Sequence, residues 1–250
     1  MSIFPLPPLG HRFDYTVRTA DIDRRKQLTV PALLRVMQEA AMQNVLRIRL
    51  SVWDLEPHGI SWVLVKFRLE VERLPGLGES LTVSTYPAGF EKYFTYRDYY
   101  VHDADGRLLA RGSSQWLLMD TATRKMTRIP EFITAHAAQM TNRADWLPHP
   151  ARRLPATATE TGRRQYLVDY YDLDFNGHLN NAHYFRWMLE ALPLSYLTER
   201  PLRSMEVHFR AEAYHNDTLQ STVAALPDSS FRHALLREGQ ELAIGHTVFE

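Results

Sequence analysis

The sequence predicts an α+β protein built from two similar units, each a long helix wrapped by a curved antiparallel sheet. Two observations support this fold class. A pattern of residues recurs after 151 positions, and each half of the chain holds one long stretch with helical periodicity among several strand-like stretches. An amphipathic helix and antiparallel strands bury their apolar faces by packing on each other. Two such units can also pair their sheets edge to edge within one chain.

The repeat is carried by two short matches at the same separation. Residues 21–23, Asp-Ile-Asp, recur at 172–174 as Asp-Leu-Asp, and Glu39-Ala40 recurs as Glu190-Ala191. An Asp-x-Asp match alone is weak, but a second match at the same distance is hard to attribute to chance. We therefore expect the two halves to share one order of elements.

The first unit is predicted to contain one strand, one helix and four further strands. Residues 13–19 alternate as a strand does, and residues 31–46 place apolar side chains at helical spacing, with Pro31 suited to the first turn. The remaining strands are expected at residues 61–72, 80–87, 93–102 and 108–118, separated by turns rich in Gly, Pro and Asp.

The second unit is predicted to follow the same order. A strand is expected at residues 165–170 and a helix at 182–197, followed by strands at 205–214, 218–226, 231–238 and 242–249. Between the units the chain is irregular, and three prolines interrupt it. We therefore expect a first unit at residues 1–130, a connecting segment at 131–160 and a second unit at 161–250.

The composition is that of an ordinary globular protein. Of 250 residues, 45% are hydrophobic and 23% charged, and 29 Lys and Arg balance 29 Asp and Glu. No overall charge attracts nucleic acid or an anionic membrane, and no apolar run is long enough to span a bilayer. The first ten residues lack the pattern of a secretory signal, so we expect a cytoplasmic protein. These features leave a homodimer open.

The absence of cysteine restricts the chemistry. With no Cys in the chain, disulfides, thiolate metal sites and a thiol nucleophile are excluded. The 11 His residues show no close metal-binding spacing. We therefore expect no metal and no other cofactor.

The polar stretch at residues 172–181 is the strongest candidate for an active site. It combines carboxylates, an amide, an imidazole and a glycine ahead of a predicted helix, although Asp, Asn and Gly also suit a simple turn with an N-cap at Asn180 or Asn181. The repeat separates the two interpretations. Asp23 matches Asp174, but Arg25 and Gln27 stand where the second unit has Asn176 and His178. The turn itself therefore does not require the amide of Asn176 or the imidazole of His178.

Several motifs resemble the acyl-ACP thioesterases of plants and bacteria, a double hotdog family. They lie at residues 17–41, 62–64, 113–130 and 172–190, so the similarity covers nearly the whole chain. The resemblance implies a tandem double hotdog fold and hydrolysis of fatty acyl-ACP, which releases free fatty acid and ends chain elongation. It also implies the catalytic residues Asp174, Asn176, His178 and Glu212. In plant members a Cys follows the Glu, where this chain has Ala213.

Thioester hydrolysis needs an activated water and donors for the oxyanion, because a thiol with a pKa of about 8.5 leaves easily. We expect His178 to work with a carboxylate, either Asp174 or Glu212. The Asn176 amide and backbone N–H groups near Gly177 or the start of the second helix are the expected donors. The first unit is expected to recognise the acyl chain through Leu34, Met37, Ala41 and Trp62.

The resemblance also implies an acyl carrier protein as partner, carrying the acyl group on phosphopantetheine. Because that carrier is acidic, it would dock on a basic surface. The candidate carrier-binding residues are Arg24, Arg25, Arg152, Arg153, Arg163 and Arg164. Runs of this kind are often only solvated surface.

Three other functions remain open at this point. An acyl-CoA thioesterase can share the scaffold and the site. A dehydratase of hydroxyacyl thioesters pairs His with a carboxylate, although the Asn176 and His178 spacing beside Asp174 favours hydrolysis. A non-catalytic acyl-thioester-binding regulator would be expected to carry a DNA-binding helix-turn-helix, and the sequence shows no such pattern.

Overall fold

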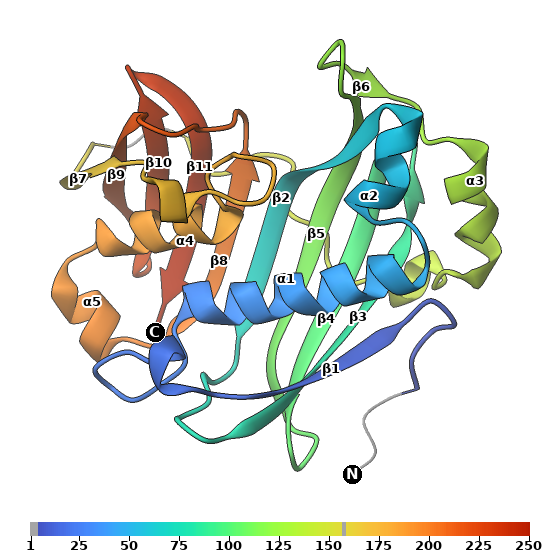
Figure 1. Ribbon diagram of the computed structural model, residues 1–250. Helices are drawn as coiled ribbons and strands as arrows, with labels where there is room; N and C mark the ends of the chain where they lie inside the picture. Colours follow the sequence, from blue (N-terminus) through green and yellow to red (C-terminus); the bar gives the residue numbers. More distant parts are fainter. Residues whose placement is uncertain (1–4, 157–158) are drawn as a thin grey trace.

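The computed structural model describes residues 5–156 and 159–250. Residues 1–4 of the proline-rich start and residues 157–158 of the connecting segment lie outside this description, so the expectations placed on them are not addressed. Within the described part, eleven strands form one sheet in which every paired neighbour is antiparallel, with the order β1-β3-β4-β5-β2-β8-β11-β10-β9-β7 and β6 added to β5 (Figure 1). The predicted α+β fold class is confirmed.

The first unit contributes its long helix and the strands that lie side by side in the order β1-β3-β4-β5-β2, with β6 added to β5. Its elements are β1 His11–Thr16, η1 Thr19–Asp21, α1 Val30–Arg47, α2 Val52–Leu55, η2 Glu56–His58, β2 Ile60–Val71, β3 Ser80–Glu91, β4 Phe94–Asp103, β5 Leu108–Asp120 and β6 Met126–Thr127. Helix α1 begins where the sequence predicts, because Thr29 accepts a hydrogen bond from the N–H of Ala32 and Pro31 lies in the first turn.

The connecting segment and the second unit complete the sheet. Their elements are α3 Glu131–Thr134, η3 Ala135–Gln139, η4 Arg143–Asp145, β7 Gly162–Leu167, η5 Tyr170–Asp172, α4 Asn181–Glu190, α5 Leu194–Glu199, β8 Leu202–Phe209, β9 Thr218–Leu226, β10 Ser230–Arg237 and β11 Gln240–Phe249. The short helices η1 and η5 fall at matching positions of the repeat, as do the starts of the two loops that follow them.

The two units join where β2 pairs with β8. The antiparallel register runs from Lys66 opposite His208 to Glu70 opposite Ser204, which confirms the expected edge-to-edge pairing. Helices α1 and α4 lie on the same face of the joined sheet (Figure 1), and β2 meets α4 through the edge-to-face rings of Phe67 and Phe185, with centroids 5.9 Å apart. One continuous core therefore runs beneath both helices.

A glycine lets the helix approach the sheet closely in each unit. A Cβ at Gly112 on β5 would lie 3.0 Å from Cε of Met37, and a Cβ at Gly245 on β11 would lie 2.8 Å from Sδ of Met188. Met37 and Met188 are matching residues of the repeat, and both are fully buried. The helix-to-sheet contact is thus built in the same way twice.

Three predicted elements of the second unit are wrong at their ends. The strand expected at 165–170 instead spans Gly162–Leu167, and Tyr170 begins the short helix η5. The helix expected at 182–197 stops at Glu190, because Pro193 has no N–H to continue the helical hydrogen bonds, and a separate helix α5 follows. The strand expected at 205–214 leaves the sheet after Phe209. Its last residues, including Glu212, instead form a loop whose Ala213 carbonyl accepts a hydrogen bond from the N–H of Leu179.

Residues 147–151 of the connecting segment lie against the sheet face opposite the helices, whereas Ile133 and Met140 of the same segment line the cavity on the helix side. The N–H of Leu147 donates to Oδ2 of Asp98, and the N–H of Ala151 donates to Oε1 of Glu206. Asp98 follows Arg97 on β4, so the side chains of these two residues point to opposite faces of the sheet. No helix in the described residues is long and apolar enough to cross a membrane.

Candidate active site

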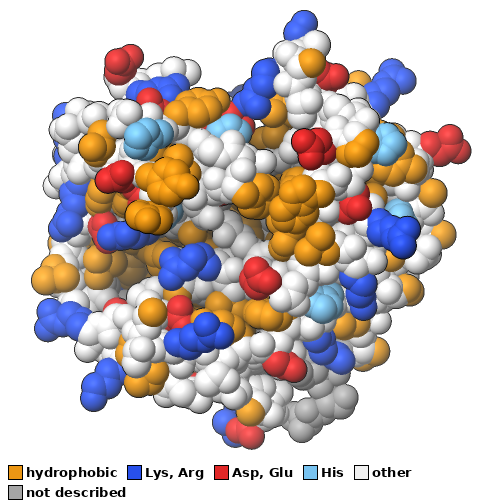
Figure 2. Space-filling model, in the orientation of Figure 1, with side chains coloured by type: hydrophobic (Ala, Val, Ile, Leu, Met, Phe, Trp, Pro, Cys, Tyr) orange, Lys and Arg blue, Asp and Glu red, His pale blue; other side chains and the backbone are white. Residues whose placement is uncertain are grey.

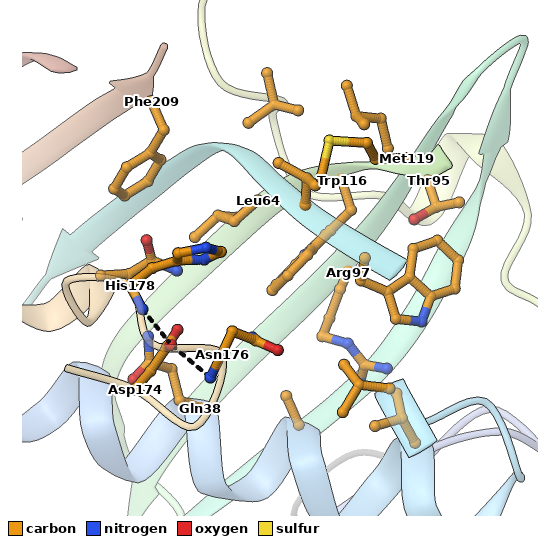
Figure 3. A pocket seen from close by; sticks show the side chains of 18 of the residues that line it. Gln38, Leu64, Thr95, Arg97, Trp116, Met119, Asp174, Asn176, His178 and Phe209 are labelled. Carbon is orange, nitrogen blue, oxygen red and sulfur yellow. Dashed lines mark hydrogen bonds between the residues drawn. The ribbon is translucent and has the colours of Figure 1, made fainter. Parts of the chain in front are cut away.

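A large cavity lies between α1, the sheet and the loop that precedes α4. Its volume is about 840 Å³, and most of its lining side chains are apolar. Helix α1 and strands β2, β4 and β5 of the first unit line most of it, and two loops of the second unit, around residues 174–181 and 209–214, close one side. Figure 3 shows Asp174, Asn176 and His178 together on that side. The polar stretch singled out from the sequence therefore borders an apolar cavity.

The loop that carries His178 is held by the carboxylate of Asp174. Its Oδ1 accepts hydrogen bonds from the backbone N–H of Asn176 at 2.8 Å and of His178 at 3.2 Å (Figure 3). Gly177 adopts the left-handed conformation with φ of 76°, which glycine enters without strain. Asn180 then caps α4 by accepting from the N–H of Ala182 at 2.9 Å. These bonds fix where the His178 and Asn176 side chains project.

His178 faces Glu212 rather than Asp174. The Nδ1 atom of His178 lies 3.5 Å from Oε1 of Glu212, and each side chain is 24% exposed. The other carboxylate oxygen of Glu212 accepts a hydrogen bond from the hydroxyl of Tyr214 at 2.9 Å and from the guanidinium of Arg124. The Tyr214 ring stands edge-on to His178 with centroids 5.2 Å apart, and burial together with the Glu212 hydrogen bond raises the pKa of Tyr214.

The donors available for an oxyanion are fewer than the sequence suggested. The N–H of Gly177 already donates to the carbonyl of Asp174, and the N–H groups of His178 and Ala182 are engaged as described above. Within the described part of the chain, the side-chain amide of Asn176 makes no hydrogen bond, and Asn176 lines the cavity. The Asn176 amide is therefore a donor that remains free to meet a substrate oxygen, whereas the N–H groups of Gly177, His178 and Ala182 are not.

The residues expected to bind the acyl chain divide into two pairs. Ala41 and Trp62 line the cavity. Leu34 and Met37 do not, and both are buried in the core, at 2% and 0% exposure. The reason is helical geometry, because the cavity is lined by Gln38, Ala41, Met42 and Val45, at the spacing of one helix face, while Met37 turns onto Gly112 of the sheet.

The residues expected to contact a carrier protein are dispersed and do not line the cavity. Arg24 and Arg25 lie in the loop that precedes α1, Arg152 and Arg153 lie in the connecting segment, and Arg163 and Arg164 lie on the edge strand β7. Arg25 pairs with Asp23 at 3.3 Å, and Arg163 pairs with Glu160 at 2.8 Å. Figure 2 shows basic and acidic side chains interspersed on the face that carries α1.

Three residues of the site were not identified from the sequence. Arg124 and Tyr214 contact Glu212, and Arg97 lines the cavity. Arg124 belongs to the β5–β6 turn of the first unit, so it reaches Glu212 only through the tertiary fold. No local sequence pattern signals such a contact. Among the described residues, no group of three or more His, Asp or Glu side chains is placed to hold a metal ion.

The architecture by itself defines a class of protein. A long helix wrapped by an antiparallel sheet, repeated once and joined through β2 and β8, is a tandem double hotdog. Solved structures of the same fold include the 12:0-ACP thioesterase of Umbellularia californica, with TM-score 0.89, 22% identity and 99% of each chain covered. Another is an acyl-ACP thioesterase of Bacteroides thetaiotaomicron, with TM-score 0.83, 21% identity and 97% of this chain and 98% of that chain covered.

The sequence comparisons give the family. The model of the acyl-ACP thioesterase N-terminal domain matches residues 8–137, and that of the C-terminal domain matches residues 156–250. The chain therefore belongs to the acyl-ACP thioesterase family. A chloroplastic acyl-[acyl-carrier-protein] hydrolase of Cuphea viscosissima is 28% identical over 96% of this chain, and a chloroplastic palmitoyl-acyl carrier protein thioesterase of Arabidopsis thaliana is 26% identical over the same share. The chain spans 62% and 63% of their lengths.

Proposed function

We propose that this protein hydrolyses the thioester of fatty acyl-ACP and releases free fatty acid, thereby ending chain elongation. The observation that supports this most directly is the pair His178 and Glu212, which stands at the border of a mostly apolar cavity of about 840 Å³. Such a cavity suits an acyl chain, and the pair suits activation of water. Family membership and the names of the relatives point to the same reaction.

The geometry supports a division of roles among the four candidate catalytic residues. Glu212 faces Nδ1 of His178, which favours the tautomer with a proton on Nδ1 and leaves Nε2 to accept a proton from the attacking water. The Asn176 amide donates to the thioester oxygen as negative charge develops on it. Asp174 holds the loop through Oδ1, so its role is to position His178 and Asn176.

Glu212 is the partner that the structure favours over Asp174 for His178. The Asp174 Oδ1 atom is occupied by two backbone N–H groups, and no contact within 4.0 Å joins it to the His178 ring in the described residues. Arg124 and Tyr214 hold Glu212 from the other side. The first unit thus contributes Arg124 to the site, in addition to the acyl-binding wall formed by residues such as Ala41 and Trp62.

The proposal is tested by assaying the purified protein on a series of acyl-ACPs of increasing length beside the matching acyl-CoAs. We expect thioester hydrolysis with acyl-ACP, and a fall in kcat of about 10²-fold or more in Glu212→Gln, which keeps the shape of the side chain but removes the charge. Faster turnover of every acyl-CoA than of its acyl-ACP would instead favour an acyl-CoA thioesterase. Absence of hydrolysis with both series would refute the proposal.

Docking of the acyl carrier protein can be tested separately from the chemistry. Within our proposal, replacing both Arg163 and Arg164 by Glu raises KM for acyl-ACP more than KM for acyl-CoA, because only the carrier meets that surface. Arg107→Glu, at a residue exposed on a different turn, is the matched control. Equal increases in KM for acyl-ACP and acyl-CoA would mean that β7 is not part of the docking surface. A cytoplasmic location is part of the same proposal.

A further inference from the structure

A buried arginine lies inside the acyl cavity, away from the catalytic pair. Arg97 on β4 is 7% exposed and lines the cavity together with Thr95 and Tyr99, which share its side of the strand. Most of the surrounding lining side chains are apolar: Met42, Val45, Leu64, Trp116, Met119 and Ile133. A guanidinium is therefore enclosed in a space otherwise suited to hydrocarbon.

The hydrogen bonds of Arg97 do not compensate its charge. Its Nη1 atom donates to Oδ1 of Asn44 at 2.8 Å and to the hydroxyl of Thr85 at 3.1 Å, both neutral acceptors. Among the described residues no carboxylate lies within 4.0 Å of the guanidinium, and Nε and Nη2 make no hydrogen bond. The neighbouring Asp98 is bonded to Leu147 beneath the opposite face of the sheet. A buried cation without a carboxylate in direct contact is costly. Burial lowers the pKa of Arg97, and the charge of Asp98, which acts from the opposite face of the sheet, only partly opposes this effect.

The guanidinium is fixed in place rather than mobile. Asn44, its partner on α1, is fully buried and is itself held by donating to the carbonyl of Leu9 at 2.9 Å. Because Nη1 is engaged in this way, the edge formed by Nε and Nη2 remains free. That edge presents two parallel N–H groups, the arrangement that binds a carboxylate in a bidentate manner.

Arg97 lies toward the end of the cavity remote from the thioester. Gln38 on α1 and the loop around residues 174–181 both line the cavity. Asn44, the partner of Arg97, lies six residues after Gln38 on the same helix, or about 9 Å further along the helix axis. In Figure 3 the Arg97 side chain lies on the far side of Asn176 from Asp174 and His178. A group that meets Arg97 must therefore sit on the distal part of the acyl chain, beyond the carbons next to the thioester.

We infer that Arg97 is a specificity-determining residue that binds an oxygen function at the far end of the acyl chain, so that the cavity accepts acyl thioesters terminating in a carboxylate. A terminal carboxylate neutralises the buried guanidinium and uses both of its free N–H groups. A terminal hydroxyl can accept a hydrogen bond without neutralising the charge, and a terminal methyl group leaves the cation unpaired. The inference rests on the proposed function only in that the ligand is an acyl thioester.

The test measures binding rather than turnover, with S-alkyl pantetheine thioethers that cannot be hydrolysed. A series of increasing chain length, ending in methyl, hydroxyl or carboxylate, is titrated calorimetrically into the protein. At the length that reaches Arg97 we expect the carboxylate-ended ligand to bind about tenfold more tightly than its methyl counterpart. Tighter binding of the methyl-ended ligand at every length would overturn the inference, whatever the variants do.

Two variants and a control sharpen the result. Arg97→Met is expected to reverse the preference by about tenfold or more, and Arg97→Lys to keep a weaker preference, because an ammonium offers charge without the bidentate edge. Arg111→Met removes an arginine that pairs with Glu70 outside the cavity, and it should leave the ratio unchanged. An unaltered ratio in a folded Arg97→Met protein would overturn the inference.

The outcome is separable from that of the proposed function. A protein that prefers the carboxylate-ended thioether but hydrolyses no acyl thioester keeps the Arg97 site and loses the enzymatic proposal. A protein that hydrolyses unsubstituted acyl-ACP and shows no carboxylate preference keeps the enzymatic proposal and loses the Arg97 site.

Discussion

The loops at residues 22–28 and 173–179 have the same backbone hydrogen bonds and different side chains. In the first loop Oδ1 of Asp23 accepts from the N–H of Arg25 at 2.8 Å and of Gln27 at 3.3 Å, as Oδ1 of Asp174 does from Asn176 and His178. Lys26 has φ of 61°, close to the 76° of the matching Gly177. The repeat at 151 residues is therefore a repeat of geometry, down to individual hydrogen bonds.

The difference extends to the segment that each loop packs against. The N–H of Leu28 donates to the carbonyl of Pro75, and the N–H of Leu179 donates to that of Ala213. The residue before Pro75 is Leu74, which packs against the core, whereas the residue before Ala213 is Glu212. The first unit thus has a glutamine and a leucine where the second has His178 and Glu212. The shared aspartate belongs to the turn, and the imidazole and carboxylate found only in the second unit are the groups to which we assign the proposed chemistry.

The largest expected effect comes from giving the second loop the side chain of the first. His178→Gln should lower kcat by about 10²- to 10⁴-fold, the usual contribution of a general base. Thermal unfolding should change little, because the loop uses the backbone N–H of residue 178 and not its ring. Steady-state hydrolysis of acyl-ACP and a melting curve measure both.

The reciprocal exchange is the control for that variant. Gln27→His places an imidazole in the first loop, but Leu74 offers it no carboxylate, so activity should stay at the level of the unmodified protein. Near-normal turnover in His178→Gln, or a second activity created by Gln27→His, would mean that the two loops do not differ in the way described.

An intermediate effect is expected from removing the shared aspartate in each loop. Asp23→Ala and Asp174→Ala each delete an acceptor of two backbone hydrogen bonds and should lower the free energy of unfolding by about 1–2 kcal/mol. Only Asp174→Ala should also lower kcat, because only that loop carries His178. Urea denaturation and kinetics give the two quantities.

Asp174→Asn separates positioning from a direct chemical role. The asparagine side chain keeps an acceptor oxygen at the Oδ1 position, so it should retain more activity than Asp174→Ala. Equal and severe losses of kcat in the two variants, with the fold intact, would show that the charge of Asp174 takes part in the reaction.

The smallest expected effect concerns the matching tyrosines of the two units at alkaline pH. Tyr15 donates to Asp21 at 2.6 Å and Tyr166 to Glu190 at 3.0 Å, and burial together with these carboxylates raises the pKa of both phenols. A raised pKa favours the neutral phenol in the fold. Its stabilisation is complete below the ordinary value of about 10 and is lost as the pH rises through the folded value.

The two units should differ in the size of that loss, because the pKa of Tyr166 is raised further. Urea denaturation between pH 9 and 11 should show a weaker fall of stability in Tyr166→Phe than in the unmodified protein, and a smaller change in Tyr15→Phe. Tyr171→Phe, at a side chain that is 92% exposed, is the control. If stability falls between pH 9 and 11 as steeply in Tyr166→Phe as in the unmodified protein, the loss does not come from ionisation of Tyr166.

The sequence predicted those parts of the molecule that depend on spacing and local pattern. The recurrence at 151 residues located the paired loops and the helices, and the departures from it at Asn176 and His178 marked the candidate site. Apolar periodicity continues past Pro193, so the spacing alone does not indicate the helix end at Glu190. Periodicity places Met37 on a buried face of the helix, but it does not show whether the sheet or the cavity lies against that face.

The remaining features required the fold. Glu212 was matched through a family resemblance, and its contact with His178 joins residues far apart in the chain. The contact of Arg124 with Glu212 crosses from one unit to the other. Arg97 carried no distinguishing pattern in the sequence, since an arginine in an alternating strand usually faces solvent. Only the closure of α1 over β4 encloses it in the cavity.

The pairing of β2 with β8 has a consequence for the order in which the protein is made. During synthesis the first unit is complete before the second exists, and its strands can pair in the order β1-β3-β4-β5-β2. Until β8 is made, one edge of β2 stays open, with unpaired N–H and C=O groups from Lys66 to Glu70. Open edges of this kind pair readily with other chains. During synthesis the chain therefore passes through a stage in which the edge of β2 in the first unit is open, and this edge is covered only when β8 of the second unit has been made.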